Sequence, residues 1–183
     1  MTRIAIPSCD ETPIGSKPIL DAFDRQFGFT PNQFTIMSLS PDALTGWTGL
    51  QGALSNTLDS KTRDGIALVV SQVNSCRYCL SAHTFLAANA AENLSLEEIS
   101  LNRMGTSRDS KRDVAVRFAK KIIETRGKVT EFDLDVVRQT GFTDANLVEI
   151  IALSVQFLFT NFINNVFDTP VDFPKVFLAP KSA

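Results

Sequence analysis

The most informative part of the sequence is residues 60–83, which read SKTRDGIALVVSQVNSCRYCLSAH. The first half of this stretch carries apolar residues on one stripe at helical spacing, namely Ile66, Val69, Val70 and Val73. Ser60 is a residue type that caps the N-terminus of a helix. The pattern therefore predicts a helix from Ser60 to Val73.

The second half of the stretch holds most of the rare residues of the chain. The 183 residues include one His, one Tyr and three Cys, against fourteen Phe. The His, the Tyr and two of the Cys lie within eight residues, at Cys76, Tyr78, Cys79 and His83. We expect a second helix over about 75–91, which carries this Cys-x-x-Cys motif.

On such a helix the two thiols and the imidazole project from one side. Cys76, Cys79 and His83 are at i, i+3 and i+7, and the last two are close enough for a direct or water-bridged hydrogen bond. A cap at Asn74 or Ser75 places Cys76 in the first turn. The helix N-terminus and the imidazole would each stabilise a thiolate. These residues predict a dithiol–disulfide couple, in which one sulfur attacks a peroxide or disulfide and the other resolves the product.

The sequence excludes two of the cofactor sites that a Cys-x-x-Cys motif can form and leaves a third open. Covalent c-type haem needs a His directly after the second Cys, where Leu80 stands, and an iron–sulfur cluster wants four Cys. Structural zinc held by Cys76, Cys79, His83 and Cys9 stays open, although the paired knuckle spacing is missing. Two buried thiols beside a core His are the purely structural alternative.

Composition narrows the class of protein further. Lys and Arg number 18 against 20 Asp and Glu, so the net charge is −2, and no nucleic-acid or anionic-membrane partner is expected. A single His excludes metal centres with two or three His ligands in one chain. The N-terminus lacks the apolar run of a signal peptide, and 183 residues need no disulfide scaffold. We expect a cytoplasmic location.

Helix signals dominate the rest of the chain, and no segment shows sustained alternation of apolar and polar residues. Predicted starts are Ser16, Thr30-Pro31, Ser40-Pro41, Ser95, Thr130 and Thr143, and Gly28, Gly105 and Gly127 are predicted stops. Residues 147–163 are very apolar but interrupted by polar residues, which indicates a buried helix rather than a membrane span. We predict one all-α domain over 1–183, with an N-terminal arm (1–15) and an extended C-terminal tail (169–183).

A weak internal sequence repeat suggests a duplicated helical unit. Residues 64–70 and 149–155 match at five of seven positions if the two acids are equated. The same offset places Asn161 and Asn164 where Cys76 and Cys79 stand. These asparagines are expected to satisfy polar groups of the backbone or of an interface between subunits. The helix at 144–167 is apolar on nearly every side, so we expect part of it to lie in an oligomer interface.

Residues 71–83 resemble the core motif of the alkylhydroperoxidase D-like proteins, in the carboxymuconolactone decarboxylase superfamily. The peroxidase-related branch, whose motif has Tyr within the Cys-x-x-Cys, is the most similar. The resemblance extends to 141–144, 159–162 and 172–174. It implies a compact all-α bundle that forms a dimer, trimer or hexamer. It also implies hydroperoxide reduction without a cofactor or metal, with the Cys pair re-reduced by a thiol or dithiol partner.

The resemblance also implies roles for individual residues. Cys79 would attack the peroxide, Cys76 would form the disulfide with it, and His83 would act as the base. Asp64, twelve residues before the first Cys, would complete a proton relay through water. This acid is usually Glu in the family, and Asp is one methylene shorter.

Tyr78 stands where the best-studied branch has a second His, and a phenol at this position is a donor rather than a base. We also expect it to pack with its hydroxyl hydrogen-bonded. Two alternative functions follow from the sequence. One is a carboxymuconolactone decarboxylase-like enzyme, which has no need of a Cys pair, and the other is a redox-sensing protein without turnover.

Overall fold

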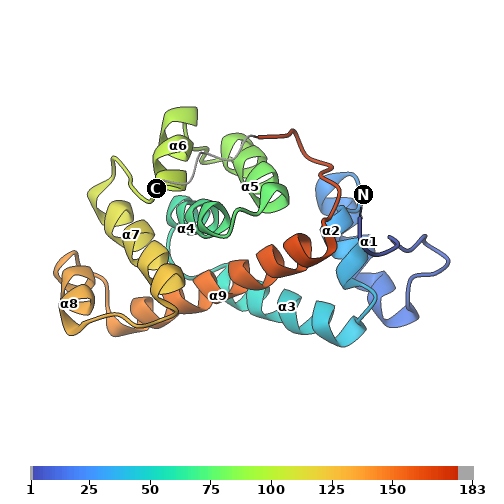
Figure 1. Ribbon diagram of the computed structural model, residues 1–183, viewed down its shortest axis with the longest axis horizontal. Coiled ribbons are helices and arrows are strands. Elements are labelled where there is room, and N and C mark those ends of the chain that lie inside the picture. Colours follow the sequence, from blue (N-terminus) through green and yellow to red (C-terminus); the bar gives the residue numbers. More distant parts are fainter. Residues whose placement is uncertain (1, 177–183) are drawn as a thin grey trace.

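The computed structural model describes residues 2–176, and this part of the chain is helical without strands (Figure 1). A short 3-10 helix, η1 (Ile14–Ser16), precedes nine α-helices in the described residues. These are α1 (Lys17–Phe27), α2 (Asn32–Met37), α3 (Pro41–Leu54), α4 (Ser60–Val73), α5 (Arg77–Asn89), α6 (Leu96–Met104), α7 (Ser110–Thr125), α8 (Glu131–Gln139) and α9 (Asp144–Phe167). The predicted all-α fold is confirmed.

Helix α4 is the centre of the molecule, since it packs against α5, α6, α7 and α9. Its residues 65–71 are all buried. The main core cluster lies around α4, α7 and α9, and a second, aromatic cluster joins α1, α2 and α3 around Phe23, Phe34 and Trp47. The helix α9 runs alongside α3 and so connects the two clusters (Figure 1).

Helix α9 has the length and composition of a membrane span, with 24 residues and a mean hydropathy of 1.6. It nevertheless packs against α3, α4, α5, α7 and α8, so it is a core helix of this fold. Burial is incomplete, because Val148, Val155 and Phe162 on its outer side are each more than half exposed.

Most predicted helix ends are confirmed, and the differences are local. Thr130 and Thr143 form capping boxes, and Gly28 and Gly105 end their helices in the left-handed conformation. The predicted cap at Ser60 is wrong. The preceding residue, Asp59, accepts the hydrogen bond from the Thr62 backbone instead. Pro31 occupies the N-cap of α2 rather than its first turn, and Ser16 makes no capping bond with its side chain.

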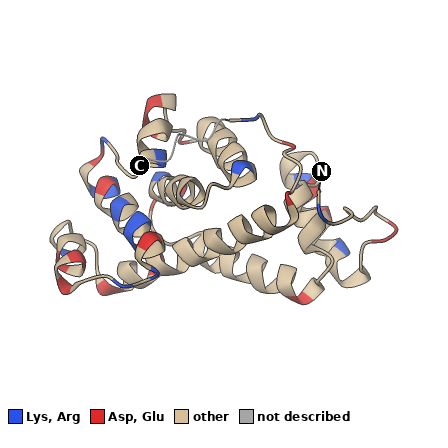
Figure 2. Ribbon diagram, in the orientation of Figure 1, with Lys and Arg blue, Asp and Glu red and all other residues tan. Residues whose placement is uncertain are grey.

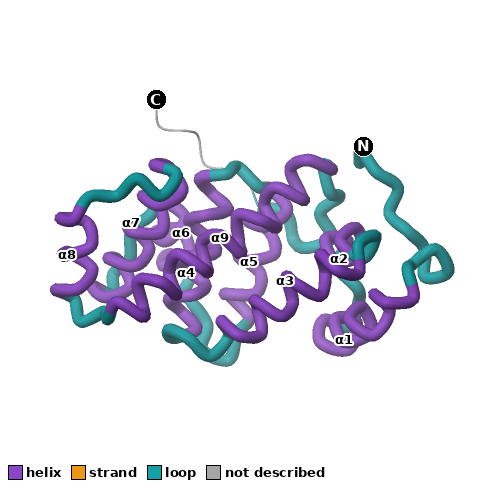
Figure 3. Tube along the Cα trace, turned by 90° about the horizontal axis from the view of Figure 1, so that it is seen from below, coloured by secondary structure: helices purple, strands orange, loops and turns teal. Residues whose placement is uncertain are grey.

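The N-terminal end of the described chain lies close to the end of α9, and the C-terminal segment lies against α5. The Arg3 backbone N–H donates to the Phe167 carbonyl at 2.8 Å. Residues 169–176 have no regular structure, and Phe173 packs its ring against Tyr78 and Phe29. The trace in Figure 3 shows this segment leaving α9 and crossing towards α5. The predicted extended tail is thus observed over 169–176, and its remainder, 177–183, lies outside the described residues.

Charged residues are unevenly distributed. They gather on α6, α7, α8 and the loops, whereas α3 and α9 are almost free of them (Figure 2). Over its 24 residues α9 carries Asp144 and Glu149 only, both near its start. This arrangement leaves an uncharged surface along the two helices.

Candidate functional site

The Cys-x-x-Cys motif lies at the reversal of direction between α4 and α5. Asn74 ends α4, Ser75 takes the left-handed conformation with φ 53°, and Cys76 is the N-cap of α5. The Cys76 sulfur accepts the backbone N–H of Cys79 at 3.3 Å. The predicted caps at Asn74 and Ser75 are therefore wrong, because the thiol of Cys76 itself takes the place of a capping hydroxyl.

Cys79 is buried in the first turn of α5, with 1% of its surface exposed. Its sulfur accepts a hydrogen bond from Asn164 Nδ2 at 3.2 Å and lies 3.9 Å from Gln33 Oε1. The two thiols are free, and the Cys76 thiol donates a hydrogen bond to the Cys79 sulfur. The predicted dithiol is thus assembled, with both sulfurs in contact.

The surroundings of the pair distinguish the two thiols. Burial opposes ionisation of Cys79, but hydrogen bonds from Cys76, Asn164, Asn161 and Thr160 outweigh it and lower its pKa. The pKa of Cys76 is raised, because its thiol donates to the Cys79 sulfur and because it is buried. Cys79 therefore loses its proton before Cys76 does.

His83 lies one turn after Cys79 on α5. Its ring meets the Phe157 ring edge-on, with centroids 5.2 Å apart. Burial lowers the pKa of His83 to about 4, so the imidazole is neutral at neutral pH. No direct hydrogen bond to Cys79 is present among the described residues. Of the two expected routes from His83 to Cys79, the direct hydrogen bond is therefore absent among these residues, and the water bridge stays a prediction.

Tyr78 packs as the sequence predicts. Its hydroxyl accepts the Gln33 backbone N–H at 3.2 Å, and its ring meets Phe173 edge-on at 5.9 Å. Burial, together with the nearby Asp172 carboxylate, raises the pKa of Tyr78 above its usual range. The phenol is therefore protonated and able to donate a hydrogen bond.

Asp64 lies in the first half of α4 and is half-buried. Burial raises its pKa to about 6, against the opposing effect of Arg63 and Arg112. Among the described residues that line the cavity beside Cys79, Asp64 is absent. A relay from Asp64 to His83 remains a prediction.

A cavity of about 80 Å³ opens beside Cys79 and His83. Most of its wall is aromatic or aliphatic, formed by Phe27, Pro31, Phe34, Trp47, Tyr78, Ala82, Leu86, Phe157 and Phe173. Gln33, Gln51, Gln156 and Thr160 supply its polar atoms. The cavity suits a small apolar group whose polar end meets the Cys79 sulfur.

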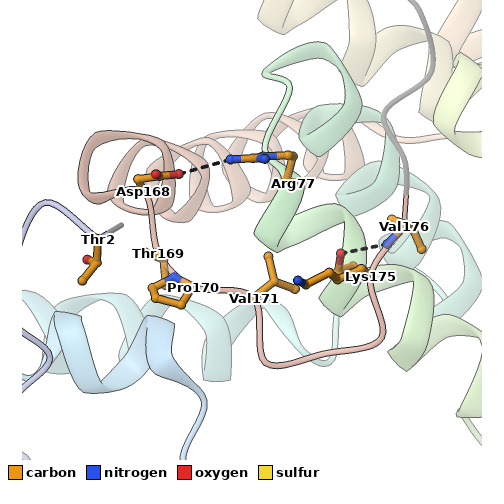
Figure 4. Close-up of a pocket in the computed structure, with 9 residues that line it drawn as sticks. Thr2, Arg77, Asp168, Thr169, Pro170, Val171, Lys175 and Val176 are labelled. Carbon is orange, nitrogen blue, oxygen red and sulfur yellow. Dashed lines mark hydrogen bonds and ion pairs between the residues drawn. The ribbon is translucent and has the colours of Figure 1, made fainter.

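A second, larger groove of about 360 Å³ lies beside the C-terminal segment (Figure 4). Arg77 and Asp168 form an ion pair across it at 3.2 Å, and Ser81 accepts the backbone N–H of Val176 at 3.2 Å. Its described lining contains no Cys or His. Cys79 therefore faces the aromatic cavity and not this groove.

Cys9 does not join the site. It is exposed and lines a separate groove with Asp10, Lys17 and Asp21. Across residues 2–176 no three His, Cys, Asp or Glu side chains are placed to share a metal ion. The zinc alternative, which needs Cys9 beside the pair, does not match this arrangement.

Asn164 and Gln33 are site residues that the sequence did not identify as such. Both contact the Cys79 sulfur, from α9 and α2. The expectation that Asn164 serves the backbone or an interface was therefore wrong, whereas Asn165 does donate to the Asn74 carbonyl. The internal sequence repeat was the one feature of the sequence that pointed to Asn164 as a site residue, because it aligns Asn164 with Cys79.

Known structures share this fold over nearly the whole chain. A peroxidase-related protein with an alkylhydroperoxidase AhpD core from Ralstonia eutropha JMP134 superimposes with a TM-score of 0.81 at 23% identity, covering 93% of this chain and 92% of that one. A peroxidase-related protein from Silicibacter sp. TM1040 gives 0.77 at 22% identity, with 92% and 91% covered. The debrominase Bmp8 gives 0.77 at 18% identity, with 94% and 93% covered.

No curated protein matches the sequence. Residues 41–121, which include α4, the cysteine pair and α5, match the carboxymuconolactone decarboxylase family. Together, the comparisons show that the chain shares the fold of these solved structures and that residues 41–121 resemble the carboxymuconolactone decarboxylase family.

Proposed function

We propose that this protein is a thiol-dependent peroxidase, in which the Cys76–Cys79 dithiol reduces an organic hydroperoxide. The observation that carries the proposal is the placement of Cys79. Its sulfur has a lowered pKa, touches the sulfur of Cys76 and lines an apolar cavity. A nucleophile, a resolving thiol and a binding space are the three parts that such a reaction needs.

The reaction proceeds in three balanced steps. The Cys79 thiolate attacks the O–O bond, so an S–O bond forms, a sulfenic acid results and the alkoxide leaves as an alcohol after taking up a proton. The Cys76 thiol then attacks the Cys79 sulfur, and the disulfide forms as water leaves. Two thiols of an external reductant, or one dithiol, finally return the pair to the reduced state and are themselves oxidised to a disulfide.

Neighbouring groups supply and remove protons in this scheme. Tyr78 is a protonated phenol in the cavity wall and is able to donate to the leaving alkoxide. His83, neutral in the same wall, is the proposed base that accepts a proton through water, and Asp64 is the proposed acid of the same relay. The reductant and the free thiols suit a reducing cytoplasm, where we propose that the protein acts in antioxidant defence.

The test is consumption of cumene hydroperoxide in the presence of dithiothreitol. We expect turnover by the wild type and by Cys9→Ser, which alters a thiol outside the site. Cys79→Ser should abolish the reaction. In a separate reaction with one equivalent of cumene hydroperoxide and no dithiothreitol, Cys76→Ser should complete one reduction and stop with a sulfenic acid at Cys79, visible as a mass increase of one oxygen. Turnover that survives in Cys79→Ser would refute the proposal.

Reductive dehalogenation is a second candidate. The debrominase Bmp8, which shares the fold, also has a structure of its C82A variant with 2,3,4-tribromopyrrole bound, and the aromatic cavity here suits a planar ring. In that reaction the thiolate takes the bromine from carbon, and the carbanion takes up a proton. Cys76 then displaces bromide as the disulfide forms. Release of bromide from a bromopyrrole, with no loss of cumene hydroperoxide, would favour this candidate.

The same two assays separate the remaining candidates. A decarboxylase or lactone-handling enzyme would keep its activity in Cys76→Ala/Cys79→Ala, since that chemistry does not call for the dithiol. A redox sensor would form a reversible Cys76–Cys79 disulfide that alters the oligomer, measured by light scattering, without turning over either substrate.

A further inference from the structure

Amide groups, rather than charged side chains, surround the reactive sulfur. Asn164 Nδ2 lies 3.2 Å from Cys79 Sγ, and Gln33 Oε1 lies 3.9 Å from it. Both residues are buried, with 3% and 9% of their surfaces exposed. They come from α9 and α2, so two helices distant in the sequence bring neutral polar groups to the sulfur.

Gln33 fixes which end of the Asn164 amide faces the sulfur. Asn164 Nδ2 donates to Gln33 Oε1 at 2.6 Å as well as to Cys79. With the Gln33 carbonyl oxygen facing it, Asn164 presents its NH₂ group, and the two hydrogens serve the two acceptors. The other end of the amide, Oδ1, is buried without a hydrogen bond among the described residues. Such an arrangement is unfavourable for folding alone and indicates a role for the NH₂ group.

The titratable groups beside Cys79 carry no positive charge at neutral pH. They are Cys76, Tyr78 and His83, all on α5 or at its start, and they are a thiol, a phenol and a neutral imidazole. The groups from α2 and α9 are the uncharged Gln33, Thr160, Asn161 and Asn164. The His83 ring meets the Phe157 ring edge-on, and among the described residues no hydrogen bond joins it to the sulfur. The uncharged polar groups around Cys79 must therefore stabilise a thiolate on its sulfur.

We propose that Asn164 is a catalytic residue whose side-chain NH₂ group stabilises the negative charge on Cys79 Sγ, with Gln33 as its positioning residue. The inference rests on Cys79 being the nucleophile of the proposed function. The hydrogen bond favours the thiolate over the thiol before the attack on the O–O bond. As the S–O bond forms, the negative charge moves to the departing alkoxide, and the NH₂ group is released to bond the new sulfenic oxygen.

The test measures the ionisation of Cys79 through the pH dependence of its alkylation by iodoacetamide, followed by peptide mass spectrometry. A Cys9→Ser background removes the exposed thiol. We expect Asn164→Leu to raise the midpoint by about one pH unit and to slow alkylation at pH 7 about tenfold. Asn165→Leu is the matched control, since this exposed neighbour donates to the Asn74 carbonyl only, and its midpoint should equal that of the background.

A measurement on the background protein without the Leu substitution covers the case in which Asn164→Leu does not fold. The side-chain ¹⁵N and ¹H signals of Asn164 should titrate with the midpoint found for Cys79, and the titration should vanish in Cys79→Ser. An unchanged midpoint in folded Asn164→Leu, or Asn164 signals that ignore the ionisation of Cys79, would overturn the inference. A raised midpoint in a protein that consumes no hydroperoxide would contradict the proposed function but retain the role of Asn164 at the sulfur.

Discussion

At the scale of single residues, Asp64 links the stability of the fold to its proposed chemistry. Burial raises its pKa from an ordinary value of 3.8 to about 6. Between these values the folded state binds a proton that the unfolded state has released. The contribution of this group to the free energy of unfolding is therefore full below about pH 4 and is lost as the pH rises through 6.

Asp64→Asn removes this ionisation while keeping the shape of the side chain. At pH 8 the free energy of unfolding should rise by about 1–3 kcal/mol, and at pH 4 it should equal that of the wild type. Urea unfolding at the two pH values measures the difference. If Asp64 also serves the relay, the stabilised variant should reduce hydroperoxide more slowly. A variant less stable than the wild type at pH 8 would show that attraction to Arg112 outweighs burial.

At the scale of elements, the contact of α4 with α6 and α7 depends on one glycine. A Cβ atom at Gly65 would lie 2.8 Å from Asn102 Oδ1 and 2.8 Å from Val116 Cγ2. Asn102 and Val116 are both fully buried, so neither side chain has space into which to move. The absence of a side chain at Gly65 thus sets how closely the helices of the core approach.

Gly65→Ala should lower the free energy of unfolding by about 1–3 kcal/mol, because overpacking forces neighbouring helices apart. Gly46→Ala is the matched control in another helix, α3, where a Cβ atom meets nothing within 4 Å. It should leave stability unchanged or raise it by up to about 1 kcal/mol, since alanine restricts the unfolded chain. Equal effects of the two substitutions in denaturant unfolding would contradict the packing account.

The elements also show how far the sequence determined this structure. The capping boxes at Thr130 and Thr143 were predictable, because all their groups lie within four residues. The capping role of Cys76 was not, since it depends on a left-handed Ser75 at the packed reversal between α4 and α5. The amides at Cys79 come from positions 46 and 85 residues away, so local patterns carry no direct signal for them.

At the scale of the whole molecule, the uncharged outer side of α9 is the largest feature that the fold leaves unexplained. Its exposed apolar residues recur at intervals of three and four and form a stripe, made up of Val148, Ile151, Val155, Phe159, Phe162 and Val166. A continuous apolar stripe of this length is unusual on the surface of a soluble monomer.

We propose that a second copy of the chain covers this stripe, as the expected homo-oligomer requires. The stripe lacks Lys and Arg, which argues against an anionic membrane as its partner. Phe162→Asp places an unpaired charge within the stripe, at a residue that is 54% exposed, and should convert the oligomer to a monomer in light scattering coupled to size-exclusion chromatography. Phe132→Asp on α8, at a Phe 75% exposed outside the stripe, should leave the mass unchanged. A wild type that is monomeric at micromolar concentration, or a Phe162→Asp variant that keeps the mass of the oligomer, would show that copies do not associate through α9.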